Sequence, residues 1–349
     1  MSERLTIAVD AMGGDHAPDM VIRGLALARE RYPHVRYILF GDEARVGPLL
    51  ERMPQAAEVS EFRHTPDAIS NDAKPSIALR SGRQSSMRLA INAVADGEAG
   101  GVISAGNTGA YMATAKFALK TLSTIDRPAI VATTPSRRGD VVMLDLGANI
   151  ECDAENLVQF AVMGEVFARI VLGIQKPTVG ILNVGAEDLK GVDTVRLAAS
   201  MLRQSALAAT FHGFVEGNDI TAGRVDVVVT DGFTGNVAIK TIEGAGQFMS
   251  GLLRDMFGSS WRSRLGYLLA RPAVEYLRQS LDPRRYNGAM LVGLNGVAVK
   301  SHGGTDEIGF AHALGVAIDM VGNDINKKIR EEFENFDFKG EKPPPAVAL

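Results

Sequence analysis

The chain has 349 residues, of which 46 % are hydrophobic, and it carries a formal net charge of −4. This length suits about two domains' worth of chain or one large α/β unit with two lobes, and the negative balance argues against nucleic acid as a partner. The single cysteine, Cys152, excludes an internal disulfide and fits a reducing, cytoplasmic compartment. The sequence starts directly with a strand pattern instead of a signal peptide, and no run of about 18 uncharged apolar residues predicts a membrane span.

Short apolar runs alternate with longer helical patterns along the whole chain. The predicted strands are 5–10, 35–41, 101–106, 128–133, 141–147, 177–185, 225–232 and 296–303, and the predicted helices include 18–31, 84–96, 107–120, 155–171, 192–206, 236–256 and 307–333. Most of the strands lack polar alternation, as expected when both faces are buried. The pattern predicts a three-layer α/β fold with a mainly parallel sheet covered by helices. Residues 289–300 instead predict a hairpin that turns at Asn295-Gly296.

No repeat or linker divides the chain, so we expect one catalytic α/β body over residues 1–335. Residues 65–84 form its least regular internal stretch, and a helical projection is expected near 257–285, where the composition changes. The last segment, 336–349, ends in a proline run and is expected to be a flexible tail.

Glycine-rich loops with polar side chains follow six of the predicted strands. They are AMGGDHAP after Asp10, AGNTG after Ser104, LGANIE after Asp145, VGAEDLKG after Asn183, GFTGN after Asp231 and SHGGTDE after Lys300. In open α/β sheets ligands bind outside the carboxyl ends of strands. Glycine lets the backbone approach a ligand, and a helix that starts after the loop presents free N–H groups and a positive dipole end. The loops therefore predict one site for a phosphate-like anion.

Each of these residues also has a purely structural interpretation. Asn107 and Asn236 lie at strand-to-helix junctions, where Asn can donate an amide hydrogen bond to a ligand or can only cap the helix. The remaining candidates are open in the same way: Asp10, Asp145 and Asp231 as loop-closing residues, His16 and His302 as structural histidines, and Lys190 as a solvated lysine. Six similar loops together favour the functional interpretation more strongly than any single loop does.

Several sharper motifs are missing from the sequence. There is no G-x-x-x-x-G-K-[ST] loop, no G-x-G-x-x-G fingerprint in the first βαβ unit, no G-x-S-x-G elbow, no H-E-x-x-H and no paired cysteines. A P-loop ATPase is therefore not expected, and neither a metal nor another cofactor is expected. A dehydrogenase of the isocitrate type would need a nicotinamide site and clustered aspartates for a divalent metal, and the sequence shows no such cluster.

Twelve stretches, in chain order, resemble the bacterial phosphate acyltransferase family. They are AVDAMGGDHAP (8–18), KPSIALR (74–80), SSMRLAI (85–91), SAGNTGA (104–110), DRPAI (126–130), LDLGANI (144–150), QFAVMG (159–164), LNVG with the following EDLKG (182–191), VEGNDI (215–220), VVTDGFTGNVAIKT (228–241), LDPRRYNGA (281–289) and VKSHGG (299–304). The similarity runs from about residue 5 to 335. One departure is Ala186, where the family pattern has an acidic residue, so that Glu187 and Lys190 are the matching positions.

The resemblance implies transfer of an acyl group from acyl carrier protein to inorganic phosphate, which supplies acyl phosphate for phospholipid synthesis and for a downstream glycerol-phosphate acyltransferase. It implies a fold similar to phosphotransacetylases and to isocitrate and isopropylmalate dehydrogenases. It further implies a homodimer without nicotinamide that associates peripherally with the membrane. Two alternatives stay open: a phosphotransacetylase acting on a short acyl coenzyme A, and a non-catalytic membrane scaffold, which would leave the six loops unexplained.

The chemistry of the loops suggests roles for two sets of residues. The proposed catalytic set is His16, Asn107, Lys190, Asp231, Asn236, Lys300 and His302. The proposed substrate-binding set is Asp10, Gly13, Gly14, Asp15, Ser104, Gly106, Thr108, Gly109, Asn149, Gly232, Gly235, Ser301 and Gly303. The two Asn amides would contact phosphate and the oxyanion, the two Lys would supply positive charge, and His16 or His302 would protonate the leaving thiol. Asp231 and Asp15 would orient these groups. Cys152 is expected to be a packed thiol and not a nucleophile.

Residues 254–285 are unusually basic, with seven arginines and three acidic residues. Trp261, Leu265, Leu268 and Leu269 recur at helical spacing among the arginines, and Pro272 is predicted to divide the segment into two short helices. Such a helix suits an anionic membrane surface through residues 261–277, with a tip at 265–274 in the lipid interface. The same charge would attract an acidic carrier protein. The alternative is a dimer helix whose leucines are buried against a partner.

Overall fold

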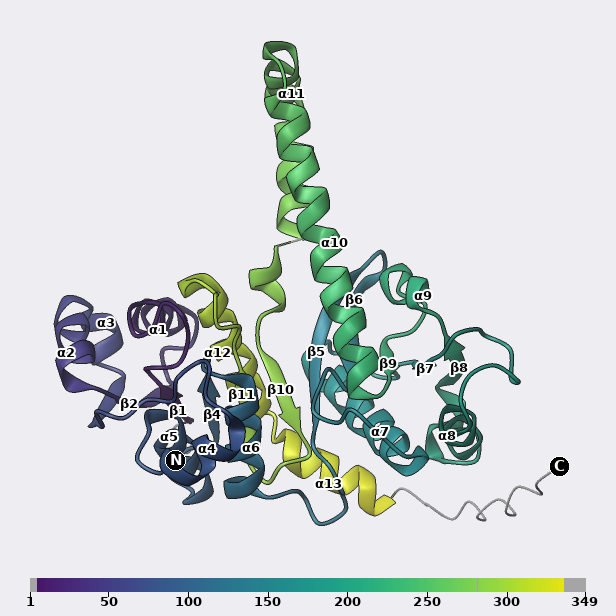
Figure 1. Cartoon of the computed structure of the whole chain (residues 1–349), viewed down its shortest axis with the longest axis horizontal. Coiled ribbons are helices and arrows are strands. Elements are labelled where there is room, and N and C mark those ends of the chain that lie inside the picture. The colour runs from purple at the N-terminus through teal and green to yellow at the C-terminus, as the bar shows by residue number, and fades with distance from the viewer. Residues whose placement is uncertain (1–4, 281, 336–349) are drawn as a thin grey trace.

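The structure is a computed structural model that describes residues 5–280 and 282–335. The strands are β1 (Thr6–Asp10), β2 (Arg36–Gly41), β3 (Ser60–His64), β4 (Gly101–Ser104), β5 (Ala129–Ser136), β6 (Gly139–Leu144), β7 (Val179–Leu182), β8 (Phe211–Val215), β9 (Val227–Val229), β10 (Ala289–Val292) and β11 (Val297–Lys300). The α-helices are α1 (Asp19–Arg31), α2 (Glu43–Arg52), α3 (Pro54–Ala57), α4 (Pro75–Ser81), α5 (Ser86–Ala95), α6 (Thr108–Leu119), α7 (Ala154–Val171), α8 (Asp193–Arg203), α9 (Gly217–Ala222), α10 (Gly232–Gly258), α11 (Trp261–Ser280), α12 (Glu307–Gly322) and α13 (Ile325–Asn335). Two short 3₁₀ helices, η1 (Ala206–Ala209) and η2 (Pro283–Tyr286), complete the described elements, and Figure 1 shows their arrangement.

One sheet of 11 strands runs through the whole body in the order β3-β2-β1-β4-β11-β10-β5-β6-β9-β7-β8. Neighbouring strands of this sheet pair in parallel, except that β10 pairs antiparallel with β11 and with β5, and β5 pairs antiparallel with β6. The expected α/β fold with a mainly parallel sheet is thereby confirmed. The strands β3 and β8 were missed from the sequence because they form the two edges of the sheet, where a strand has only one neighbour and needs no long apolar run.

The antiparallel strands in the middle of the sheet reverse the direction in which the parallel strands on either side of them run. The predicted hairpin at 289–300 is confirmed as β10 and β11, and a second hairpin joins β5 to β6 through the turn at Arg137–Arg138. Three successive pairings are antiparallel: β11 with β10, β10 with β5, and β5 with β6. Strands β6, β9, β7 and β8 therefore run opposite to β1, β4 and β11. The carboxyl ends of the two groups of strands therefore do not share one edge of the sheet.

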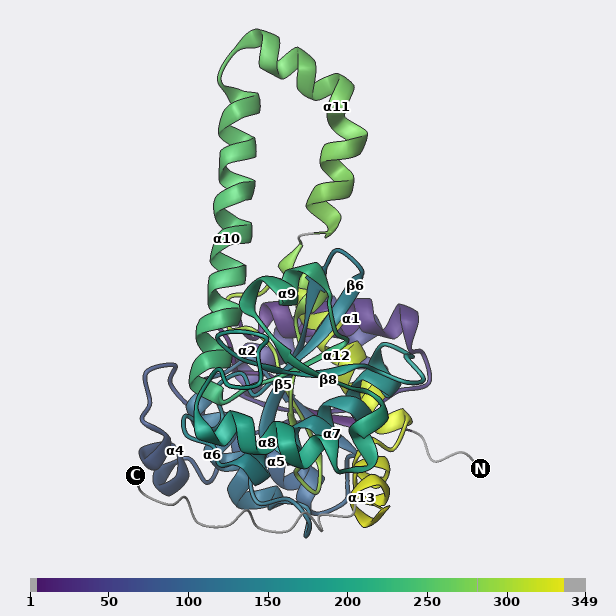
Figure 2. The same ribbon diagram turned by 90° about the vertical axis from the view of Figure 1, so that its right-hand side faces the viewer.

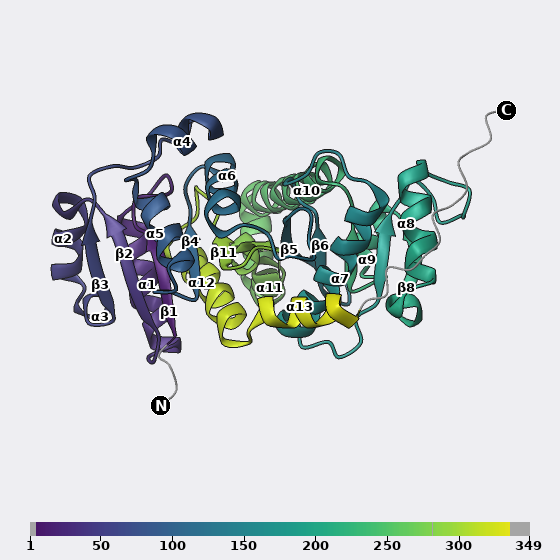
Figure 3. The ribbon, with the colours of Figure 1, turned by 90° about the horizontal axis from the view of Figure 1, so that it is seen from below.

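Helices cover both faces of the sheet, each over its own apolar cluster. Buried residues of α1, α7, α8, α12 and α13 pack against one face, and residues of α4, α5, α6, α9 and α10 pack against the other. Figure 3 shows α6 beside the base of α10 on the second face. Helix α6 begins directly after the loop of Ser104, whereas α10 begins at Gly232, so that the predicted loop GFTGN is the first turn of this helix. The three layers thus bring two helix starts of interest to the same side of the sheet.

Helices α10 and α11 form a hairpin that stands out from the body (Figures 1 and 2). With 27 residues, α10 spans about 40 Å. The projection is therefore larger than the expected 257–285, since α10 runs without a break from the loop of Asp231 to the turn at Ser259–Ser260. Near that turn the rings of Phe257 and Tyr267 join the two helices at a centroid distance of 5.4 Å.

Two expectations about helices need correction. Pro272 lies inside the single helix α11, which changes direction along its length in Figure 2, so it does not divide the segment into two helices. Residues 265–274 lie on α11, in the part of the hairpin that follows the end turn, and their contact with lipid stays a prediction. The predicted helix 307–333 is two helices, because Asp324 adopts a positive φ of 52° between α12 and α13. The predicted tail, 336–349, lies outside the described residues, and no described helix is long and apolar enough to cross a membrane.

Candidate functional site

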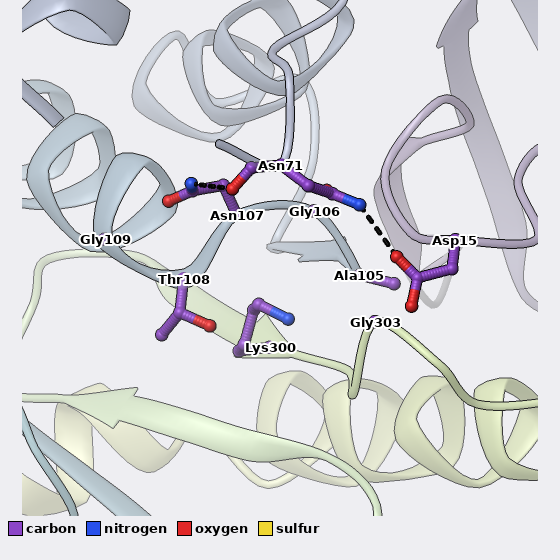
Figure 4. Close-up of a pocket in the computed structure, with 9 residues that line it drawn as sticks. All are labelled: Asp15, Asn71, Ala105, Gly106, Asn107, Thr108, Gly109, Lys300 and Gly303. Carbon is purple, nitrogen blue, oxygen red and sulfur yellow. Dashed lines mark hydrogen bonds between the residues drawn. The ribbon is translucent and has the colours of Figure 1, made fainter. Parts of the chain in front are cut away.

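A pocket of about 380 Å³ lies where the loops after β1, β4 and β11 meet, and Figure 4 shows it in close-up. Its walls come from three chain segments that the sheet order makes neighbours and from one segment between β3 and α5. The lining residues are Asp15, Asn71, Ala105, Gly106, Asn107, Thr108, Gly109, Lys300 and Gly303. All of them except Asn71 and Ala105 belong to the two predicted sets.

A buried carboxylate, that of Asp10, holds these loops together beneath the pocket. It accepts hydrogen bonds from Ser86 Oγ at 2.6 Å and Ser104 Oγ at 2.7 Å, and from the backbone N–H of Met12 at 3.2 Å. A Cβ at Gly13 would come within 2.8 Å of the Asp10 carboxylate, of Ser104 Oγ and of the next loop, so this position requires glycine. Burial raises the pKa of Asp10. Asp10 therefore connects β1, β4 and α5 and does not line the pocket.

Asn107 caps α6 and anchors a neighbouring loop. Its Oδ1 accepts from the N–H of Ala110 at 2.8 Å, while its Nδ2 donates to the carbonyl oxygens of Asn71 at 2.5 Å and Ala73 at 3.2 Å. The side chain of Asn71 in turn donates to Asp15 Oδ1 at 2.7 Å. The amide of Asn107 is thus already used by the protein, and it holds one wall of the pocket instead of presenting a free donor.

The groups left for an anion in this pocket are the start of α6 and the side chain of Lys300. The N–H groups of Thr108 and Gly109 belong to the first turn of α6 and have no hydrogen-bond partner within the described part of the chain. Lys300 ends β11, and its amine lies between Thr108 and Asp15 in Figure 4, where it donates to the carbonyl oxygen of Ser301. Burial lowers the pKa of Lys300 to about 8, partly offset by the nearby carboxylates of Asp10 and Asp15.

The loop after β11 is fixed by a residue that the sequence did not single out. Asn287 is buried, and its Nδ2 donates to Ser301 Oγ at 2.9 Å and to the carbonyl oxygen of Gly309 at 2.8 Å. Its Oδ1 accepts from the backbone N–H of His302 at 2.8 Å. The backbone carbonyl of Gly303 accepts from the N–H of Asp15, which joins this loop to the one after β1. Gly14 belongs to the same junction and has a φ of 110°.

Both candidate histidines are exposed and lie outside the residues that line the pocket. His302 Nδ1 accepts from the N–H of Gly304 at 3.1 Å, which leaves the proton on Nε2 when the imidazole is neutral. His16 lies in the loop after β1, where its carbonyl oxygen accepts from the N–H of Met20. The geometry therefore does not select one of them as the proton donor.

A second group of predicted residues surrounds the ends of β6 and β9. Asp145 is buried and accepts hydrogen bonds from the N–H groups of Ile130, Gly147, Ala148 and Asn149. The side-chain amide of Asn149 also donates to this carboxylate at 3.0 Å. Burial raises the pKa of Asp145. Asp145 thus shapes its loop, as Asp10 does in the first group.

Helix α10 starts directly against this loop. Asp231 caps the helix by accepting from Thr234 N–H at 2.9 Å and Oγ1 at 2.7 Å. The N–H of Gly232 donates to the carbonyl oxygen of Asn149 at 2.7 Å, and a Cβ at Gly235 would lie 1.9 Å from the carbonyl oxygen of Asp145. Asn236 lies beside Gly147, and its amide has no hydrogen-bond partner in the described part of the chain. Of the predicted side chains at this loop, Asn236 is therefore the one still available to a ligand.

The structure brings together most, but not all, of the predicted residues. Asp10, Gly13, Gly14, Asp15, Ser104, Gly106, Asn107, Thr108, Gly109, Lys300, Ser301 and Gly303 belong to the pocket and its support, and Asn149, Asp231, Gly232, Gly235 and Asn236 belong to the second group. Lys190 lies apart, exposed in the loop after β7, where its carbonyl oxygen accepts from Asn183. Neither the second group nor Lys190 lines the pocket. The pocket therefore gathers the loops after β1, β4 and β11, and the residues of the other three predicted loops lie outside its lining.

Cys152 has no feature of a reactive thiol. It is half-buried, and its Sγ donates to the carbonyl oxygen of Asn149 at 3.6 Å. Burial raises the pKa of the thiol to about 11, and the negative charge of Asp145 acts in the same direction. The side chain is therefore a protonated thiol near neutral pH.

Comparison with known proteins identifies the family. Residues 5–328 match the model of a family described as fatty acid synthesis protein. The phosphate acyltransferase of Rhodospirillum centenum is 64 % identical over 332 residues, which cover 95 % of this chain and 94 % of that one. The chain belongs to the phosphate acyltransferase family. It is therefore an acyltransferase, and the resemblance seen in its motifs is confirmed. The corresponding protein of Rhodospirillum rubrum is 60 % identical, with 95 % of each chain covered.

Solved structures of other enzymes share the fold. A phosphotransacetylase from Streptococcus pyogenes superposes with a TM-score of 0.62 at 17 % identity, covering 93 % of this chain and 95 % of the other. A 4-hydroxythreonine-4-phosphate dehydrogenase from Klebsiella pneumoniae superposes with a TM-score of 0.53 at 12 % identity, covering 91 % and 100 %. These likenesses concern the architecture alone. They confirm the expected relation of the fold to phosphotransacetylases and to a class of dehydrogenases.

Proposed function

We propose that this acyltransferase transfers an acyl group from the thioester of an acyl carrier protein to inorganic phosphate, giving acyl phosphate and a free carrier thiol. The observation that supports this most directly is the pocket at the start of α6. There the N–H groups of Thr108 and Gly109 and the amine of Lys300 line one space of about 380 Å³. A helix start together with a cation is a suitable site for phosphate.

The reaction forms one bond and breaks one. A phosphate oxygen attacks the thioester carbonyl carbon, the new C–O bond forms, the C–S bond breaks, and the leaving thiolate takes up a proton. Phosphate is already an anion near neutral pH, so a strong general base is not required. The protein has to hold phosphate beside the carbonyl, stabilise the tetrahedral oxyanion and support departure of the thiolate.

Within this scheme Lys300 and the first turn of α6 bind phosphate. Asn236, whose amide is free, is proposed to donate to phosphate or to the oxyanion from the start of α10, the neighbouring helix on the same face. Lys190 is proposed as a further positive charge, brought in from the loop after β7. His302 through Nε2, or His16, remains the proposed donor of the proton to sulfur.

Other predicted residues act as positioning residues in this proposal. Asn107 and Asp10 make several hydrogen bonds within the protein that shape the pocket, and neither has a donor left for phosphate. Asp231 caps α10 and so fixes the helix that carries Asn236. Asp15 lines the pocket near Lys300, so its carboxylate would orient that amine.

The helical hairpin is proposed to serve membrane and dimer contact. Leu268 and Leu269 are 63 % and 84 % exposed, and Trp261 is 70 % exposed with the guanidinium of Arg262 over its ring. Arginines beside exposed apolar side chains suit an anionic lipid surface. A second copy of the chain packed along α10 would leave the end turn free for lipid. The acyl phosphate would then be released close to the bilayer, where a glycerol-phosphate acyltransferase would consume it.

The experiment that tests the proposed function measures release of thiol with and without phosphate. The substrates are an acyl carrier protein thioester and the coenzyme A thioester of the same acyl chain. We expect phosphate-dependent release from the carrier thioester, with acyl phosphate formed in equal amount. Release that is independent of phosphate would contradict the proposal. Preference for a short acyl coenzyme A would favour the alternative, a phosphotransacetylase.

A further inference from the structure

A group of basic residues lies next to the pocket, on and around α4, α5 and α6. Residues 73–95 and 99–125 contain six basic residues and no acidic one, in a chain whose net charge is −4. The six are Lys74, Arg80, Arg83, Arg88, Lys116 and Lys120, and they belong to α4, α5, α6 and the residues that flank these helices. We call these residues, with the apolar side chains of Ile77 and Phe117, the α4–α6 surface.

The charges of this surface are not compensated by the protein. Lys74, Arg80, Arg83, Lys116 and Lys120 are all exposed, and none of them forms an ion pair with an acidic residue in the ranges that the structure describes. Partial burial lowers the pKa of Arg88, and the nearby positive charge of Arg83 lowers it further. Like charges at such short range repel one another, so the surface would be stabilised by an acidic partner.

Apolar side chains lie among these charges. Ile77 is 54 % and Phe117 65 % exposed, and the guanidinium of Arg88 lies 5.0 Å from the centre of the Phe117 ring. An exposed aromatic residue beside an arginine is typical of a protein–protein interface, where aromatic residues and arginine are enriched. The combination favours a protein as the partner over a small anion.

The surface starts at the rim of the pocket. Pro75, the first residue of α4, lies so close to Gly109 that a Cβ on this glycine would come within 2.9 Å of the proline ring. Asn107 holds the carbonyl oxygen of Ala73, next to Lys74. Figure 3 shows α4, α5 and α6 grouped on one side of the body. A protein bound there would be positioned to deliver a group into the pocket.

We propose that the α4–α6 surface is the docking site of the acidic carrier protein that brings the acyl thioester to the pocket. The proposal rests on the proposed function and adds to it the place where the carrier binds. It differs from the expectation that the arginines of 254–285 attract the carrier. Arg254, Arg262, Arg264 and Arg271 lie on the hairpin of α10 and α11 that stands out from the body, whereas Lys74 and Pro75 border the pocket itself.

The test compares a charge-reversed variant with a charge-conserving one. Arg80→Glu/Arg83→Glu changes two exposed residues that take no part in the proposed chemistry, and Arg80→Lys/Arg83→Lys keeps their charge. The same reversal on the hairpin, Arg262→Glu/Arg264→Glu, is the matched control. Each protein is assayed with acyl carrier protein thioester and with an acyl-pantetheine thioester, which has the reacting group but no carrier.

We expect Arg80→Glu/Arg83→Glu to lower kcat/KM for the carrier thioester about tenfold or more, mainly through KM, because surface charges at an interface steer association. Its kcat/KM for acyl-pantetheine should stay within about twofold of the unaltered enzyme, and the Lys and hairpin variants should resemble the unaltered enzyme with both substrates. The activity of the unaltered enzyme with the carrier thioester should also fall with added salt more steeply than that of the reversed variant.

Four results would overturn the docking proposal. One is unchanged KM for the carrier thioester in Arg80→Glu/Arg83→Glu. Another is an equal loss with acyl-pantetheine, which would mean that the substitutions damage the pocket. The third is a greater effect of the hairpin variant on the carrier thioester. The fourth is a loss of binding to anionic vesicles in the Arg80→Glu/Arg83→Glu variant only. Failure of the proposed function is distinct, because the unaltered enzyme would then release no thiol in response to phosphate from either thioester.

Discussion

The two asparagines that look equivalent in sequence should respond differently to the same substitution. In Asn107→Ala the helix cap is lost, together with two hydrogen bonds to the loop at Asn71 and Ala73. Loss of a cap costs about 1 kcal/mol, and each exposed or partly buried hydrogen bond contributes roughly 0.5–1.5 kcal/mol. The free energy of unfolding should therefore fall by about 2–4 kcal/mol, and the melting temperature by roughly 5 °C or more.

Asn236→Ala removes a side chain whose amide makes no hydrogen bond in the described structure. Its free energy of unfolding should stay within about 0.5 kcal/mol of the original value. Loss of one donor to phosphate or to the oxyanion lowers the rate by on the order of a hundredfold, which corresponds to about 2.7 kcal/mol of transition-state stabilisation. This variant should thus be folded, stable and slow.

Thermal unfolding and thiol release at saturating phosphate and thioester separate the two effects. Asn107→Asp is a useful control, because it keeps the oxygen that caps α6 and loses only the two Nδ2 donors. The reasoning is refuted if Asn107→Ala keeps its melting temperature and loses turnover as strongly as Asn236→Ala does, since its amide would then contact the substrate. Normal turnover in Asn236→Ala would remove Asn236 from the chemistry.

Three further predictions concern other residues. Lys300, with a pKa of about 8, should bind phosphate only when protonated, so kcat/KM for phosphate should fall as pH rises through 8. In Lys300→Arg this decline should move to higher pH. An unchanged pH profile in the variant would exclude Lys300 as the cation. Cys152→Ser should keep most activity, because a thiol with a pKa of about 11 is a poor nucleophile, and an acyl-cysteine trapped during turnover would disprove this. Leu268→Glu/Leu269→Glu should release the protein from anionic vesicles while turnover on soluble substrate persists. Unchanged co-sedimentation would place the membrane contact elsewhere, and a monomeric variant would assign the leucines to the dimer.

The central strands could be predicted because burial on both faces leaves a continuous apolar run. Ile7, Val102 and Val228 are completely buried, and each lies in a strand found from sequence. The edge strand β3 reads SEFRH, and its residues are exposed or half-buried, so no apolar run marks it. The direction of the strands was harder to predict, because it depends on which strands are joined by a hairpin turn and therefore run antiparallel. The hairpin of β10 and β11 has an Asn-Gly turn, whereas that of β5 and β6 turns at Arg137–Arg138, which is not a strong turn sequence.

The polar residues that sequence reasoning missed share one property. Asn71, Ser86 and Asn287 reach the pocket or its supporting loops only through contacts between distant parts of the chain. Ser86 is 76 positions from the carboxylate that it binds, and Asn71 is 56 positions from Asp15. No local pattern can show such a pair. One hint was present, since residues 65–84 were recognised as irregular, and an irregular stretch without its own core often covers a site.

The two groups of loops use the same device, and this explains which candidates keep a functional role. Each group has one buried aspartate, Asp10 or Asp145, that accepts hydrogen bonds from the loop after its strand, and each leads to a capped helix on the same face of the sheet. A carboxylate whose oxygens are occupied by these donors does not bind an anion. Burial raises its pKa, and the hydrogen bonds act in the opposite direction. The aspartates that mark the loops in the sequence are thus the supports. In the proposed function phosphate is met instead by groups with unused donors, among them Lys300, the first N–H groups of α6 and Asn236.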